Sequence, residues 1–252
     1  MEGWIQFGRG PLFRFSFALM LLGLLRLLVL TGANLGDVYR NTGDRRLPWK
    51  DMARQTLAWL FPLGRLWRRR PFYSTLSFIF HAGMIVTPLF LAVHVLLWNE
   101  AVGFAWPAIP QRLANVLTLT VIATAVGLFL GRVLPSGVRR ISRLQDFVWP
   151  VLLAVPFITG YVASNLRVSP ATYQLTLLTH VYAGDLIMLM IPFTKIAHCV
   201  LAPLSQLVTQ AAWKFAPGAG DRVAETLGYA DRPNWLAKAR LSGPAASSES
   251  GK

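Results

Sequence analysis

Charged residues are scarce in this 252-residue chain, because Asp, Glu, Lys and Arg together make up only 14% of it. A soluble domain carries roughly 25% charged residues, so the shortage argues against a soluble fold. Hydrophobic residues reach 54% of the chain. Apolar runs of about 20 residues recur, and a helix of that length crosses a hydrocarbon core about 30 Å thick. The composition therefore predicts an integral membrane protein.

Acidic residues and cysteine are also few. The 11 acidic residues face 25 Lys and Arg, a formal net charge of +14. In a soluble protein this balance would indicate nucleic acid, but here the basic residues flank apolar spans, and no nucleic-acid partner is expected. The lone Cys199 excludes an internal disulfide, a cysteine-rich iron–sulfur site and a C-x-x-C-H site for covalent haem. No convincing cleavage site follows the first apolar run, so that span is expected to remain.

Five apolar segments predict membrane-spanning helices, because lipid offers no partner for exposed backbone groups. They cover residues 11–31, 75–98, 113–134, 147–164 and 177–204. We therefore expect an all-α integral membrane bundle of five transmembrane helices over residues 1–204. The tail over residues 205–252 is expected to be cytoplasmic, and its last dozen residues, low in apolar content, are expected to be disordered.

The connections between these spans alternate between rich and poor in Lys and Arg. The first, residues 32–74, carries nine, whereas the second, residues 99–112, carries only Arg112. The third is again basic, the fourth has Arg167 alone, and the tail carries six. Because basic loops stay on the cytoplasmic side, the N-terminus is predicted outside and the C-terminus inside.

Residues 51–70, within the first basic loop, mix Leu, Trp and Phe with Arg. This pattern predicts a short interfacial helix, interrupted at Pro62, that lies on the anionic inner leaflet. Membrane anchoring is the simpler interpretation of this segment, and docking of a cytoplasmic partner is the other.

All four histidines lie inside predicted spans: His81 and His94 in the second, His180 and His198 in the fifth. Ionisable residues within a membrane are functional candidates. A lone histidine there forms a helix–helix hydrogen bond as often as it acts as a ligand. Two pairs of histidines on two helices are harder to explain by helix–helix hydrogen bonds alone. Imidazole is an axial ligand of haem iron, and two pairs predict two haem b groups with all four histidines as iron ligands. A set of polar helix contacts remains the alternative.

The two histidine helices are expected to run in opposite directions, so His81 should face His198 and His94 should face His180. The 18 residues between His180 and His198 amount to five helical turns of about 3.6 residues, which puts both on one face. His81 and His94 are 13 residues apart and would be roughly 140° out of phase on an ideal helix. A kink at Pro88 is expected to change that phase. His94 is the least secure of the four ligands.

The fifth span, LTHVYAGDLIMLMIPFTKIAHCVLAP, resembles the last span of respiratory nitrate reductase gamma subunits. That family has two haem-ligating histidines at this spacing, with a Pro-Phe-(Ser/Thr)-(Arg/Lys) stretch before the second. The matching residues here are His180, Pro192, Phe193, Thr194, Lys195 and His198. The second span resembles the family's other ligand helix through Phe80, His81 and Gly83, and the resemblance covers about residues 75–205.

The resemblance implies a dihaem cytochrome b that exchanges electrons between quinol or quinone and a partner redox subunit. That partner would be an iron–sulfur protein or a cytochrome c, with terminal catalysis on the other polypeptide. A multi-pass location in a bacterial or archaeal cytoplasmic (inner) membrane is also implied. His81 and His94 are three residues further apart than is usual in the family, and the 32–74 loop is long. These departures favour the wider group that includes membrane cytochromes of heterodisulfide- and sulfite-reductase-associated complexes.

Five other charged or polar residues are candidates for a role in the membrane. Asp185, with Tyr182 as an assisting group, is predicted to accept a proton from quinol near the outer haem, while a hydrogen bond or pairing with Arg26 is the alternative. Arg26, Arg132 and Lys195 are candidates for contacts to haem propionates. Snorkelling to the headgroups is the commoner role for Arg132 and Lys195.

A rival interpretation is a proton-coupled transporter without haem, in which the histidines and Asp185 form a relay. Helices broken at mid-membrane would favour it, and Pro88 and Pro192 leave it open. It explains the 18-residue spacing of His180 and His198 less well.

Overall fold

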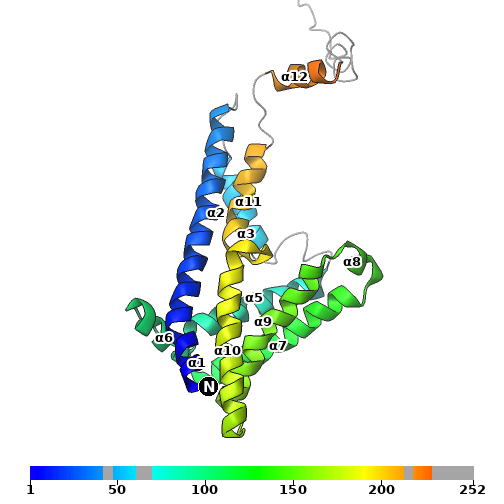
Figure 1. The fold of residues 1–252 in the computed structure, drawn as a ribbon. Coiled ribbons are helices and arrows are strands. Elements are labelled where there is room, and N and C mark those ends of the chain that lie inside the picture. Colours follow the sequence, from blue (N-terminus) through cyan, green and yellow to red (C-terminus); the bar gives the residue numbers. More distant parts are fainter. Residues whose placement is uncertain (42–47, 61–69, 213–217, 229–252) are drawn as a thin grey trace, which may run out of the picture. The chain divides into compact units, whose positions relative to one another are not determined.

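The computed structural model describes residues 1–41, 48–60, 70–212 and 218–228, and these are almost entirely helical (Figure 1). The described residues within 1–31 and 48–206 form one compact unit, and the others form a second. No strand occurs in the described ranges, where β-type pairing is limited to an isolated bridge between Leu91 and Ile109. The predicted all-α class is confirmed.

Five helical stretches of the described chain are long and apolar enough to cross a membrane. The first, Glu2–Asn41, joins α1 (Glu2–Phe7), a π-helical turn (Gly8–Leu12) and α2 (Phe13–Asn41). The others are α5 (Pro71–Phe90), α7 (Gln111–Val133), α9 (Leu144–Asn165) and α10 (Pro170–Met190), the last extended by a 3-10 turn (Ile191–Phe193). The five predicted spans are confirmed by length and composition, while the sidedness of the termini stays a prediction.

Shorter helices connect or follow the spans. They are α3 (Trp49–Leu60), α6 (Ala92–Val102), α8 (Ser136–Ile141), α11 (His198–Ala212) and α12 (Ala219–Thr226). Residues 51–60 of the predicted interfacial segment lie in α3, whereas residues 61–69, with Pro62, lie outside the described residues. The terminal stretch predicted to be disordered also lies outside them.

Three predicted span boundaries are wrong. The first span is longer than residues 11–31, and the second and fifth are not single helices. The 75–98 segment is interrupted at Leu91, between α5 and α6, and the 177–204 segment is interrupted by 3-10 turns between α10 and α11. Pro88 precedes one interruption and Pro192 lies in the other. Proline accounts for both breaks, because it removes a backbone donor and disfavours a continuing helix.

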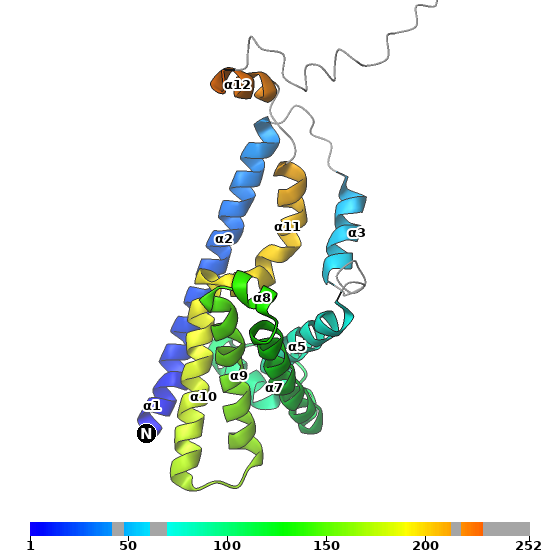
Figure 2. The same cartoon turned by 90° about the vertical axis from the view of Figure 1, so that its right-hand side faces the viewer.

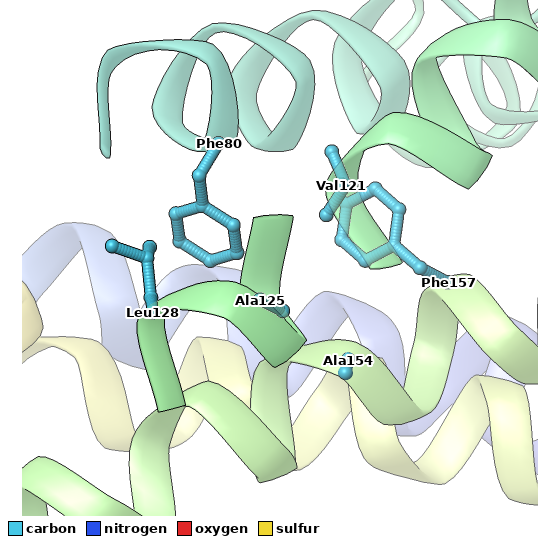
Figure 3. Packing of buried hydrophobic residues seen from close by; sticks show 6 residues of the cluster. All are labelled: Phe80, Val121, Ala125, Leu128, Ala154 and Phe157. Atoms are coloured by element: carbon cyan, nitrogen blue, oxygen red, sulfur yellow. The ribbon is translucent and has the colours of Figure 1, made fainter. Parts of the chain in front are cut away.

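The spans α5, α7, α9 and α10 pack on one another in chain order (Figure 2). Their shared core is an apolar cluster drawn from α5, α7 and α9, namely Phe80, Val121, Ala125, Leu128, Ala154 and Phe157 (Figure 3). Small residues let α5 and α7 approach closely, since a methyl group at Gly83 would lie 2.5 Å from Val121 Cγ2 and one at Gly127 would lie 2.7 Å from Leu76 Cδ2. The core thus joins α5, α7 and α9, and α10 packs on α9 at the other end of this order from α5.

The first span contacts both segments that carry the outer histidines. A methyl group at Gly8 would lie 2.6 Å from Val181 Cγ1 in α10. Farther along the span, the Phe13 and Phe17 rings pack edge-on against Trp98 of α6, at centroid distances of 5.2 and 4.8 Å. The first span therefore lies against α6 and α10 together.

Candidate functional site

The four histidines meet in two pairs, each made by segments far apart in the sequence. The rings of His81 in α5 and His198 at the start of α11 have centroids 5.9 Å apart and planes 80° apart. The rings of His94 in α6 and His180 in α10 also have centroids 5.9 Å apart, but their planes differ by only 20°. These are the pairs that antiparallel histidine helices predict.

Every one of these imidazoles uses Nδ1 to bind a backbone carbonyl. The acceptors are the carbonyl oxygens of Ser77 for His81 (2.7 Å), Pro88 for His94 (3.1 Å), Pro156 for His180 (2.8 Å) and Lys195 for His198 (2.6 Å). A carbonyl oxygen only accepts, so each Nδ1 must carry the hydrogen, and in the neutral ring Nε2 then bears the lone pair. Metal-bound histidines typically have this arrangement, which fixes the tautomer and the ring orientation.

The break in the second span sets the direction of His94. Leu91 has an extended backbone (φ −65°, ψ 131°), and α6 starts afresh after it, with the His94 amide bonded to the Leu91 carbonyl at 2.9 Å. An unbroken helix would put His81 and His94 roughly 140° out of phase, and the interruption between them means that they do not share one regular helix. A kink was expected at Pro88, and the helix is instead unwound three residues later, at Leu91.

The unwinding at Leu91 frees three successive carbonyls from helical bonding, and each has another donor. His94 Nδ1 donates to the Pro88 oxygen (3.1 Å), Trp106 Nε1 to the Leu89 oxygen (2.8 Å) and the Ile109 amide to the Phe90 oxygen (2.9 Å). An unpaired carbonyl is costly in lipid, so a broken membrane helix needs such partners. His94 is thus a candidate ligand and also supplies a hydrogen-bond donor to one of the carbonyls that the break leaves free.

The fifth span also reaches its second histidine through irregular backbone. Thr194 is extended (φ −130°, ψ −179°), and its hydroxyl donates to the Met190 carbonyl at 2.9 Å. A 3-10 turn (Lys195–Ala197) follows and presents the Lys195 carbonyl to His198. Five regular turns do not connect His180 to His198, so the prediction that periodicity puts them on one face is wrong, although His198 still meets His81.

Span α9 shapes the site around His180 through residues that sequence reasoning missed. Pro156 supplies the acceptor for Nδ1, and the Thr159 hydroxyl lies 3.4 Å from the same nitrogen. A methyl group at Gly160 would lie only 2.9 Å from the imidazole Cε1. The Thr-Gly pair within an otherwise apolar span was the available signal for a ring packed against this helix.

Basic side chains gather at the end of the bundle that is predicted to be cytoplasmic. Lys195 forms a 2.7 Å ion pair with Asp146 of α9, an acid that sequence reasoning missed. Arg132 of α7 lies 5.9 Å from the ring centre of Tyr73 in α5 and donates to the Leu128 carbonyl. Arg26 is exposed on α2. Of the three predicted propionate contacts, Lys195 is the one directly linked to a histidine, through its carbonyl.

Asp185 is buried in α10, only 2% exposed, and its Oδ2 has no hydrogen-bond partner among the described residues. The alternative pairing with Arg26 is not present among the described ion pairs. Tyr182, three residues earlier and on the same helical face, donates its hydroxyl to the Trp4 carbonyl at 3.2 Å. Asp185 is about 140° around α10 from His180, so the two side chains leave the helix on different faces.

The donor sets match one kind of metal group better than others. No group of three or more His, Cys, Asp or Glu that could hold a metal ion occurs in the described part of the chain. A structural or catalytic zinc ion takes three or four protein ligands. An iron already held by a macrocycle needs only two axial ligands, and two imidazoles supply them. Isolated histidine pairs therefore fit haem and do not fit a metal bound by protein alone.

Comparison with known proteins gives a relative but no activity. A protein from Nitratidesulfovibrio vulgaris strain Hildenborough is 37% identical over 151 residues, which is 60% of this chain and 66% of the relative. The chain thus spans slightly less than two thirds of that relative, whose name is given only as "Protein". No model of a protein family matches the chain, and no solved structure matches it.

Proposed function

We propose that this chain is the dihaem cytochrome b membrane subunit of a quinol- or quinone-linked respiratory oxidoreductase. It would carry electrons across the membrane between a quinone site and a partner redox subunit. The observation that carries the proposal is the arrangement of the four histidines. Their rings lie in two pairs, and each Nδ1 donates a hydrogen bond to a backbone carbonyl. Each Nε2 is thereby left with a lone pair for iron.

The spacing within each pair supports axial ligation. With metal–nitrogen bonds of about 2 Å and the width of the rings, two imidazoles on opposite sides of one metal have centres about 6 Å apart. Both pairs have centroids 5.9 Å apart. His180 does join two helices through Nδ1, which donates to the Pro156 carbonyl of α9, but no hydrogen bond of Nε2 is found for any of the four within the described residues. His81 with His198, and His94 with His180, would each hold one haem.

The residues around the histidines have definable tasks in this function. A haem held by two of these imidazoles would supply one-electron transfer. The four carbonyls orient the rings and raise the basicity of Nε2. Gly160 leaves space for the His180 ring. Arg132 and Lys195 would face anionic propionates at the inner end, and Arg26 is the remaining basic candidate within the first span.

Quinol chemistry needs a proton acceptor, and Asp185 is the proposed one. Its buried, unpartnered Oδ2 supports this role, because an intramembrane carboxylate without a partner is a candidate for proton transfer. Tyr182 lies on the same face and would assist. Asp185 would take the proton at Oδ2 and pass it to the outer side, which the charge of the loops places at the N-terminal end of α10.

The wider assignment follows from the charge pattern and the resemblance. The chain would lie in a bacterial or archaeal cytoplasmic membrane with its N-terminus outside and its C-terminus cytoplasmic. Its partner would be an iron–sulfur subunit on the inner face, or a cytochrome c if electrons flow inward from outside. Terminal catalysis would belong to that other polypeptide.

A proton-coupled transporter without haem is the second candidate, because two spans are broken. Unwound backbone in transporters typically offers free carbonyls to ions. Here the carbonyls of Pro88, Leu89 and Phe90 are already paired, and the Lys195 carbonyl accepts from His198. This pairing favours the cytochrome.

The deciding experiment is a dithionite-reduced minus oxidised spectrum of the purified protein, with haem counted per chain. We expect two low-spin haem b groups. Replacing any one of the four histidines by Ala should lower the count toward one. The matched control is Thr179→Ala, which should retain both: Thr179 lies beside His180 but is exposed, and among the described residues its hydroxyl is bonded only to the Leu175 carbonyl. Folded protein without haem, after expression with haem supplied, would favour the transporter.

A further inference from the structure

The segment between α6 and α7 supplies two of the three donors that hold the broken helix at Leu91. Trp106 and Ile109 both lie in this segment, whereas the third donor, His94, lies in α6. Leu91 itself forms a parallel bridge with Ile109. The unwound turn is thus paired along its length with a strand-like piece of the following loop.

This loop is itself held in place at several points. It begins at Gly103, whose left-handed backbone (φ 76°) ends α6, and it ends at Pro110, which caps α7. Between them, the Trp106 ring lies 5.8 Å from Phe104 and 6.1 Å from Trp98 of α6. The indole is therefore fixed by packing and presents its N–H to the Leu89 carbonyl.

Loss of these donors would change the direction of His94. Without the Trp106 and Ile109 donors, the Leu89 and Phe90 carbonyls would be unpaired in an apolar setting, which is costly. A continuous helix would avoid this cost, because each carbonyl would then accept from the amide four residues later. Restoring that helix would rotate the segment after Leu91 and return His94 toward a phase roughly 140° from His81. The loop donors select the broken form, and the broken form is the one that aims His94 at His180.

We propose that Trp106, together with the Ile109 amide, is a positioning residue for His94. Its indole N–H holds the unwound turn open and so sets the nearly parallel arrangement of the His94 and His180 rings. The role rests on the proposed function, since it concerns the orientation of a haem ligand. No hydrogen bond or ring contact joins either residue to the pair among the described residues, so the effect is transmitted through the carbonyls of Leu89 and Phe90.

The electron paramagnetic resonance spectrum of the oxidised protein tests this role, because it reports the angle between axial imidazole planes. Nearly parallel planes separate the energies of two iron d orbitals and give a rhombic low-spin signal. Nearly perpendicular planes leave these orbitals close in energy and give a highly anisotropic signal. The angles of 20° for His94 with His180 and 80° for His81 with His198 assign one signal type to each pair.

The decisive variant is Trp106→Phe, which keeps an aromatic ring but removes the N–H. We expect the rhombic signal to weaken or move to higher g, and haem content to fall from two toward one, while the highly anisotropic signal stays. Trp98→Phe is the matched control: Trp98 packs in the same aromatic group, but no hydrogen bond of its indole is found among the described residues. It should leave both signals unchanged.

A second variant, Ile109→Pro, removes the other donor and should act on the same signal if Trp106→Phe does not accumulate. An unchanged rhombic signal in either purified variant overturns the positioning role while leaving the dihaem proposal intact. Equal effects of Trp98→Phe and Trp106→Phe would assign the role to aromatic packing and also overturn it. Wild-type protein without either signal would overturn the proposed function itself.

Discussion

The imidazole planes of His94 and His180 lie within 20° of each other, with ring centroids 5.9 Å apart. The other pair has the same centroid separation but planes 80° apart. The two sites thus share their donor atoms and their spacing, and differ in ring orientation. The difference arises in the backbone, because each ring is aimed by a carbonyl in a different local structure, two of them beside a broken helix.

The first prediction is that the oxidised protein gives two distinct low-spin signals of equal intensity, one rhombic and one highly anisotropic. The physical reason is the dependence of the iron d-orbital energies on the angle between axial imidazole planes. Low-temperature electron paramagnetic resonance with spin quantification measures both. His180→Ala should abolish the rhombic signal and His81→Ala the anisotropic one. Two signals of the same type would contradict the ring angles.

The second prediction concerns the space that Gly160 leaves for His180. In Gly160→Ala the new methyl group would lie 2.9 Å from the imidazole Cε1, so the ring must shift. Overpacking of this kind costs about 1–3 kcal/mol, and we expect haem content to fall toward one per chain. Gly184→Ala on α10 is the control, since nothing lies within 4 Å of its methyl position. Equal haem retention in both variants would show that the contact is unimportant.

The sequence predicted which histidines meet because that depends on only two features, their order along the chain and the alternating direction of the spans. The five spans followed from the lengths of the apolar runs. The histidine pairing and the number of spans both depend on whole segments, so errors of several residues at the span boundaries did not affect either prediction.

The local geometry was not predictable in the same way. Regular periodicity placed His180 and His198 on one face, yet His198 follows an extended Thr194 and a 3-10 turn. The position of the other break, at Leu91, depends on donors from Trp106 and Ile109, 15 and 18 residues later. A proline indicates that a helix is weakened, but tertiary hydrogen bonds decide where it opens.

The third prediction uses the ion pair of Lys195 and Asp146, which adjoins the carbonyl that orients His198. Removing the negative charge in Asp146→Asn should raise the midpoint potential of the inner haem, because less negative charge remains to stabilise the oxidised iron. Lys195→Met should lower it, and the double variant should return it close to the wild-type value. Spectroscopic redox titration measures this, and shifts of the same sign in both single variants would contradict it. Little change in stability is expected, since a partly exposed ion pair contributes about 0–1 kcal/mol.

The fourth prediction tests Asp185 as the proton acceptor. Asp185→Asn keeps the shape of the side chain but removes its ability to take a proton, so quinol oxidation should slow by roughly 10²–10⁴-fold, the contribution of a positioned base. The rate should also lose much of its dependence on pH, whereas haem content and both low-spin signals stay, because Asp185 leaves α10 on a different face from His180. Stopped-flow reduction of the haems by a soluble quinol across a pH series measures the rate.

Tyr182→Phe separates a proton role for Asp185 from a general effect on this face of α10. It removes the hydroxyl bond to the Trp4 carbonyl but leaves the carboxylate in place. If Tyr182 only fastens the first span, its variant should retain the wild-type pH profile with a modest loss of rate. If it shares in proton transfer, both variants should flatten the profile. An Asp185→Asn protein with an unchanged pH profile would exclude the carboxylate from proton transfer and leave it as a buried polar group between α10 and the first span.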